Sequence, residues 1–157
     1  MLREISEGLS APPEDISAAI EKLQAERDAN HKRLRAALEE LAEARAALLV
    51  GAVEAGADGV RVVAELLRDS DAELPVLLAT AIAKRENCVA LLVDESSGQL
   101  VFAQSVGAGR ELPALLKQVL EAVPGKGGGT RDFVRAKLTD AKRAGEALEL
   151  AKKLAKQ

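Results

Sequence analysis

A heptad repeat of apolar residues runs through the first third of the chain. From Ile16, steps of three and four residues reach ten positions over 33 residues, and eight of the ten are apolar. Charged residues dominate the other faces, so the pattern predicts one long helix with a coiled-coil stripe. The stripe positions are Ile16, Ile20, Leu23, Arg27, Asn30, Leu34, Ala37, Leu41, Ala44 and Leu48.

Such a stripe predicts self-association. We expect a homodimer in which Ile16, Ile20, Leu23, Asn30, Leu34 and Leu41 make the contacts. Although Asn30 weakens an apolar seam, a buried Asn can fix the register and the number of partners. The alternative is an intramolecular hairpin, in which the stripe packs on the C-terminal helix of the same chain.

The hydrophobic period changes after residue 48. Val- and Leu-rich runs at 47–54 and 60–67, separated by Gly-Ala-Asp-Gly, are typical of two strands around a turn. Further strands are expected at 88–93 and 99–105, with helices from Leu74, over 112–123 and from Phe133 to Leu154. The fold class is therefore α+β (α/β-like). A helical coiled-coil segment, 1–48, precedes an α/β domain, 49–157, with a small mixed sheet of about four strands.

The composition excludes several kinds of site. With two Phe and neither Trp nor Tyr, the chain lacks the aromatic platforms on which RNA-recognition modules stack bases. His31 is the only imidazole and Cys88 the only thiol, so we expect no metal site, no cofactor and no catalytic triad. The chain by itself is therefore expected not to be an enzyme. The charged start and the lack of a membrane-spanning apolar run favour a cytoplasmic protein.

Four glycines in five residues stand at 125–129. Glycine permits positive φ and has no Cβ, so its amide N–H can approach a ligand closely. Residues 126–157 carry nine basic and four acidic side chains, so the net charge is +5 from this run onward. We expect a phosphate-binding loop; the alternative is a flexible connector. Its residues are Gly125, Lys126, Gly127, Gly128, Gly129, Thr130 and Arg131.

The segment from Leu112 to Phe133, LPALLKQVLEAVPGKGGGTRDF, resembles the DHH-associated domain. This is the C-terminal domain of alanyl-tRNA synthetases and of long-form alanyl-tRNA editing proteins, and it is related to the substrate-binding domain of DHH phosphoesterases. In that family an apolar helix ends in GKGGG or GGGG. The N-terminal segment PPEDISAAIEKLQAERDANHKRL is similar to the helix that joins the editing domain to this module.

The resemblance implies a non-catalytic module that binds tRNA and dimerises through its helix. It gives Gly127, Gly128 and Gly129 the role of main-chain donors, with Lys126 and Arg131 as charge partners. The family's zinc-dependent editing site lies in a separate domain, so editing activity is not carried over. Two departures concern the ligand geometry: Val134-Arg135-Ala136-Lys137 replaces the usual Ala-Gln-Gly segment, and Thr130 stands where related phosphoesterases carry His.

Two alternatives to this function follow from the same residues. The chain could be the substrate-holding half of a DHH-type phosphoesterase, with the glycines gripping the phosphate of a nucleotide. It could also be a dimerisation arm with an incidental loop.

Overall fold

The computed structural model describes residues 4, 7–8, 12 and 15–157. The chain divides into two compact units, Met1–Ala37 and Leu38–Gln157, and each is described by itself. The segment PPEDISAAIEKLQAERDANHKRL, which resembles the joining helix, lies partly outside the described residues, since Pro13 and Glu14 are among those not described.

The long helix expected from the heptad stripe is present. Helix α2 runs over Ile16–Gly51, 36 residues. The strand expected at 47–54 is wrong, because Ala47 to Gly51 continue the helix. A short apolar run suits a buried strand and a buried helix face equally. Here Ala42 and Ala46 are buried in the core of the second unit, and this packing extends the helix past the end of its stripe.

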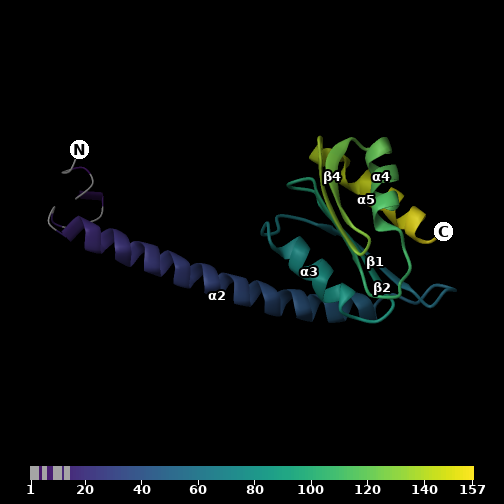
Figure 1. The fold of residues 1–157 in the computed structure, drawn as a ribbon, viewed down its shortest axis with the longest axis horizontal. Helices are drawn as coiled ribbons and strands as arrows, with labels where there is room; N and C mark the ends of the chain where they lie inside the picture. The colour runs from purple at the N-terminus through teal and green to yellow at the C-terminus, as the bar shows by residue number, and fades with distance from the viewer. Residues whose placement is uncertain (1–3, 5–6, 9–11, 13–14) are drawn as a thin grey trace. The chain divides into compact units, whose positions relative to one another are not determined.

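A mixed five-stranded sheet forms the centre of the second unit (Figure 1). The mixed-sheet class is confirmed, with one strand more than expected. In space the order is β1-β2-β3-β5-β4, where β1 and β2 are parallel and the other pairs antiparallel. The strands are β1 Arg61–Leu67, β2 Cys88–Asp94, β3 Gln99–Gln104, β4 Gly125–Thr130 and β5 Phe133–Leu138.

Helices α3 and α4 follow the expected helical segments, but the last helix begins later than expected. The sequence predicts a helix from Phe133, but Phe133–Leu138 is strand β5, and the last helix begins only at Ala144. Pro75 and Pro113 occupy the first turns of α3 and α4, where the missing N–H has no helical acceptor to lose. The helices are α3 Leu74–Ala83, α4 Leu112–Ala122 and α5 Ala144–Ala155, with a 3-10 turn at Ala141–Arg143.

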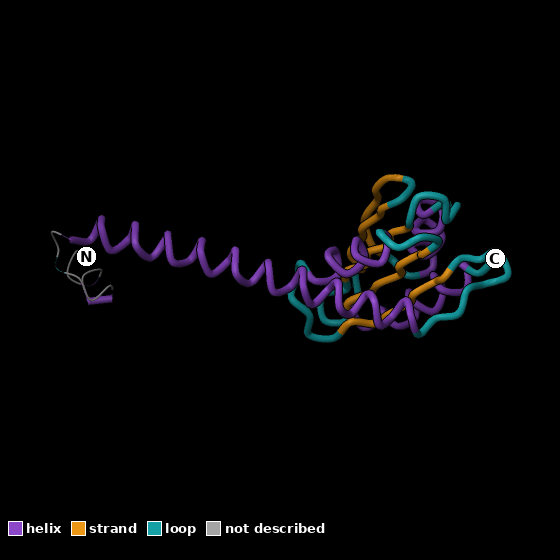
Figure 2. The backbone as a smooth tube through the Cα atoms, turned by 90° about the horizontal axis from the view of Figure 1, so that it is seen from below, coloured by secondary structure: helices purple, strands orange, loops and turns teal. Residues whose placement is uncertain are grey.

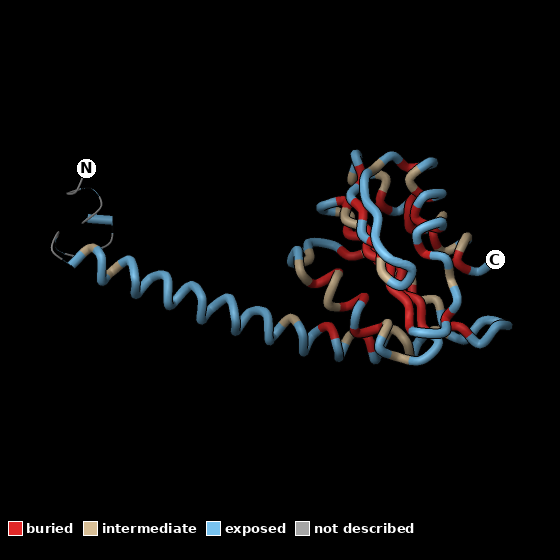
Figure 3. Tube along the Cα trace, viewed as in Figure 1, coloured by how far each residue is buried: buried red, intermediate tan, exposed pale blue. Residues whose placement is uncertain are grey.

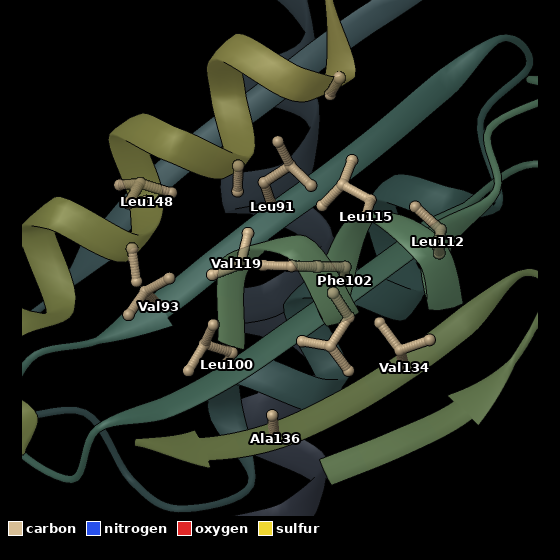
Figure 4. Close-up of a cluster of buried hydrophobic side chains, with 14 of the residues drawn as sticks. Leu91, Val93, Leu100, Phe102, Leu112, Leu115, Val119, Val134, Ala136 and Leu148 are labelled. Carbon is tan, nitrogen blue, oxygen red and sulfur yellow. The ribbon is translucent and has the colours of Figure 1, made fainter. Parts of the chain in front are cut away.

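The sheet, orange in Figure 2, separates two hydrophobic cores. The buried stretches that contribute to these cores are red in Figure 3. On one face, Leu91, Phe102 and Val134 of the strands meet Leu115 and Val119 of α4 and the apolar side of α5 (Figure 4). On the other face, α3 and the Leu38–Gly51 part of α2 cover the sheet. Strand β2 is buried throughout because it contributes to both cores.

Candidate nucleic-acid interface

The glycine run is an edge strand and not a loop. Gly125–Thr130 forms β4, which pairs antiparallel with β5 through a two-residue turn at Arg131 and Asp132. Within the run only Gly129 has a positive φ, and at 158° its backbone is almost fully extended. The expected loop is thus corrected to an exposed strand, which is pale blue in Figure 3.

The close approach of β5 explains three of the four glycines. A Cβ built on Gly125, Gly127 or Gly129 would lie 2.6, 2.2 and 2.2 Å from carbonyl oxygens of β5. Real side chains do not tolerate such contacts. Gly128 differs, because a Cβ there meets nothing within 4 Å. The packing of the hairpin therefore gives no reason for glycine at position 128.

The register decides which main-chain groups of β4 are used inside the sheet. Thr139 N donates to Pro124 O at 2.9 Å, and hydrogen-bonded pairs then recur at every second position of an antiparallel ladder. Lys126, Gly128 and Thr130 accordingly bond to β5. Gly125, Gly127 and Gly129 direct their N–H groups to the outer side of β4. Among the residues that the structure describes, no strand pairs with that side.

The free edge of β4 therefore presents a row of main-chain donors on residues that have no side chains of their own. Helix α4 lies beside it, and a groove of 380 Å³ between them is lined by Gly127, Gly128 and Gly129 together with Pro113, Leu116, Lys117, Leu120 and Glu121. Successive outward N–H groups are about 7 Å apart, two residues of an extended strand. A donor row with little steric obstruction can bind anionic groups or another strand.

A buried glutamine holds the turn of this hairpin in place. Gln104, at the end of β3, is 5% exposed, and its Nε2 donates to Asp132 Oδ1 at 2.8 Å and to Arg110 O at 2.7 Å. Its Oε1 accepts from Arg110 N at 2.9 Å. The side chain thus connects the hairpin turn to the loop before α4. The sequence analysis did not single out Gln104. The only sequence feature that could have indicated it is a polar residue at the end of an otherwise apolar strand.

The two cations expected beside the glycines do not lie together. Lys126 is near the start of β4 and Arg131 follows its end, roughly 15 Å away along the strand. Arg131 Nε lies 3.4 Å from Glu111 Oε1, and both side chains are about two-thirds exposed. Thr130 Oγ1 donates to Phe133 O at 3.3 Å, so this hydroxyl closes the turn.

Residues 135 and 137 bring two further cations to the hairpin. Arg135 and Lys137 are exposed and alternate with the buried Val134, Ala136 and Leu138. This period of two is the signal of a half-buried strand, which the helical interpretation of the segment from Phe133 overlooked. Lys137 lies directly opposite Lys126.

The residues that the sequence predicts for a dimer contact lie on α2. Ile20, Leu23, Leu34 and Leu41 are 41–50% exposed, and Asn30 is exposed as well. Ile16 is half-buried. For a Leu or an Ile this exposure is high, and the apolar stripe remains available to a partner.

Among the residues that the structure describes, the thiol and the imidazole do not lie in a reactive cluster. Burial raises the pKa of the Cys88 thiol, which lies inside β2, and His31 is exposed on α2. Across the described part of the chain, no group of three His, Cys, Asp or Glu side chains could hold a metal ion. No helix in that part is long and apolar enough to cross a bilayer.

No protein-family model matches the chain. The alanine–tRNA ligase of Methanosarcina barkeri is 28% identical to it over 161 residues. That alignment covers 100% of this chain but 17% of the ligase, so the chain spans a small part of this relative's length.

Several solved structures share the fold. The C-Ala domain of Aquifex aeolicus alanyl-tRNA synthetase has a TM-score of 0.55 at 17% identity, over 66% of this chain and 96% of the domain. RecJ from Thermus thermophilus, in complex with Mg²⁺, has a TM-score of 0.54 at 15% identity, over 92% of this chain and 21% of RecJ.

The chain has an α+β fold that is similar to the C-Ala domain and to part of RecJ. In sequence, the whole chain is similar to a segment of alanine–tRNA ligases. The resemblance drawn from the glycine-containing segment is therefore confirmed.

Proposed function

We propose that this chain is a non-catalytic tRNA-binding and dimerisation module of an alanyl-tRNA synthetase or editing-type protein, and that it works in the cytoplasm. The tRNA-binding part of this proposal rests on the free edge of β4. Three outward glycine amides stand there, beside an exposed cation at Lys126. Similarity to alanine–tRNA ligases over the whole chain supports tRNA as the RNA.

A salt titration with an alanine tRNA transcript tests the binding half. Phosphate contacts release counterions, so binding should weaken steeply as salt rises. Lys126→Ala with Arg131→Ala should weaken binding and make the slope of log K against log salt shallower by about 2. The charge-matched control is Lys142→Ala with Lys153→Ala, two exposed positions after β5. Salt-independent binding, or no binding to any folded RNA, would contradict the proposal.

The dimerisation half rests on the apolar stripe of α2. Helix α5 is the segment on which an intramolecular hairpin would have to pack. Its residues Ala147, Leu148 and Ala151 are already buried in the core with α4 and the sheet. This arrangement favours pairing of α2 with a second copy of the chain.

Light scattering on stripe variants tests the dimer. Leu34→Asp with Leu41→Asp should convert the dimer to a monomer, because two carboxylates would enter an apolar seam. Ala29→Asp with Ala36→Asp adds the same charge at exposed positions away from the stripe and should remain dimeric. A Leu34/Leu41 variant that stays dimeric would remove the coiled-coil assignment.

The likeness to RecJ favours one second candidate. In this function the chain is the substrate-holding half of a DHH-type phosphoesterase, and the amides of β4 bind the phosphate of a nucleotide. Titration with a 5′-phosphorylated dinucleotide alongside tRNA separates the two functions. Tight binding of the dinucleotide supports the phosphoesterase half, and binding of tRNA alone supports the synthetase-type module.

A further inference from the structure

Three cations share one face of the β4–β5 hairpin: Lys126, Arg135 and Lys137. Arg135 and Lys137 are exposed on the face of β5 opposite to the core formed with α4 and α5. Directly opposed residues of an antiparallel pair project to the same face, so Lys126 joins Lys137 there. We call these three residues the basic strip.

The basic strip has no carboxylate partner among the described residues. Several other cations of this unit do have one, among them Arg143 with Glu146 at 2.7 Å and Lys84 with Glu43 at 3.0 Å. Within the described part of the chain, none of the three strip residues has such a partner within 4 Å. Like charges directly opposite each other destabilise a sheet, and Lys126 faces Lys137 in this way.

The strip also lines a shallow groove of 440 Å³ whose other polar atoms include an unused donor. Gln99 pairs with Lys137 from the β3 side, and its Nε2 is buried without an acceptor. The remaining lining comes from Ala72, Ser97 and Ala136. All charged side chains of the lining are cations, so the groove offers donors to an incoming acceptor.

The lack of a side chain at Gly128 keeps the basic strip accessible. Gly128 is the direct cross-strand partner of Arg135, and a side chain there would stand on the same face. A Cβ at this position has open space around it, so hairpin packing does not require glycine. Because position 128 has no side chain, the guanidinium group of Arg135 can be reached across β4. A guanidinium group binds phosphate in a bidentate manner.

We propose that the basic strip binds the sugar–phosphate backbone of a folded RNA that crosses the β4–β5 hairpin on this face. The inference deepens the proposed tRNA-binding function and depends on it. It assigns phosphate contacts to Arg135 and Lys137, which the glycine motif does not include. It also gives Gly128 the role of leaving room for the RNA backbone.

Gly128→Glu and Gly128→Gln form a matched pair of variants that tests this assignment. Both add a side chain of the same size at a position with free space, so both should fold with the wild-type thermal midpoint. Only Glu places a carboxylate opposite Arg135, where it competes with RNA phosphate. Binding of an alanine tRNA transcript at low salt should weaken roughly tenfold more for Glu than for Gln.

A second pair of variants removes charge from the strip. Arg135→Ala with Lys137→Ala should make the slope of log K against log salt shallower by about 2, and the Lys142/Lys153 control should change it less. If wild-type protein binds tRNA and both strip tests match their controls, the strip assignment is wrong and the tRNA-binding function stands. If wild-type protein binds no folded RNA, the strip assignment and the tRNA-binding function are both wrong. If wild-type protein binds tRNA, Gly128→Glu weakens this binding more than Gly128→Gln does, and Arg135→Ala with Lys137→Ala gives the shallower salt slope, the strip assignment and the tRNA-binding function are both supported.

Discussion

Replacing Gly127 by alanine should lower the free energy of unfolding by about 1–3 kcal/mol, the usual range for overpacking a well-packed site. The new Cβ would lie 2.2 Å from Arg135 O and 2.3 Å from Ala136 Cα. These are main-chain atoms of a strand paired on both sides, so they cannot move without disturbing β3 as well. Urea denaturation followed by far-UV circular dichroism measures the change.

Gly128→Ala is the control one residue away. Its Cβ meets no atom within 4 Å, and alanine is favoured over glycine in a strand by roughly 0.5–1 kcal/mol. This variant should therefore be as stable as the wild type or slightly more stable. Equal destabilisation by the two alanines would mean that β4 does not pair with β5 in the observed register.

Gln104→Leu should lower the free energy of unfolding by about 1–3 kcal/mol, because it leaves the part-buried N–H and C=O groups of Arg110 and the carboxylate of Asp132 without their partner. The effect should be concentrated at the hairpin turn. Amide hydrogen exchange of Phe133 and its neighbours is expected to accelerate more than exchange in β2, which lies farther from the lost contacts.

Gln99→Leu is a matched control on the same strand. The Nε2 of Gln99 is buried without an acceptor, so its removal loses no hydrogen bond from that atom. The stability of this variant should stay within about 0.5 kcal/mol of the wild type or rise. A Gln104 variant no less stable than the Gln99 variant would show that the turn does not depend on the Gln104 contacts.

The amphipathic and fully buried segments could be predicted from the sequence because local pattern decides them. Leu112–Ala122 follows a clean helical period with proline in its first turn, and the uninterrupted apolar run from Cys88 belongs to a strand covered on both faces. The 36-residue helix likewise follows its heptads. Only its end was misplaced, where Ala42 and Ala46 pack against the sheet domain and extend it through a predicted strand.

The hairpin at the candidate site could not be predicted, because its partner determines its conformation. Glycines at 125, 127 and 129 do not by themselves favour a strand. They form one here because β5 approaches too closely for any side chain. Phe133–Leu138 fits a strand period through Arg135 and Lys137, yet its apolar residues also continue into the helical pattern of α5. The sequence predicts a candidate site at 125–131 but does not predict that its glycines form a strand.

The unpaired side of β4 has a consequence for association of the protein with itself. Sheets normally discourage strand addition at their margins with charged side chains, proline or bulges. In β4 the three residues whose N–H groups face outward lack side chains. Only Pro124 before the strand and Lys126 within it then discourage the addition of another strand. A polyanion lying along this margin would therefore also act as a shield against edge-to-edge aggregation. Concentrated protein stripped of nucleic acid should aggregate sooner than protein that retains it.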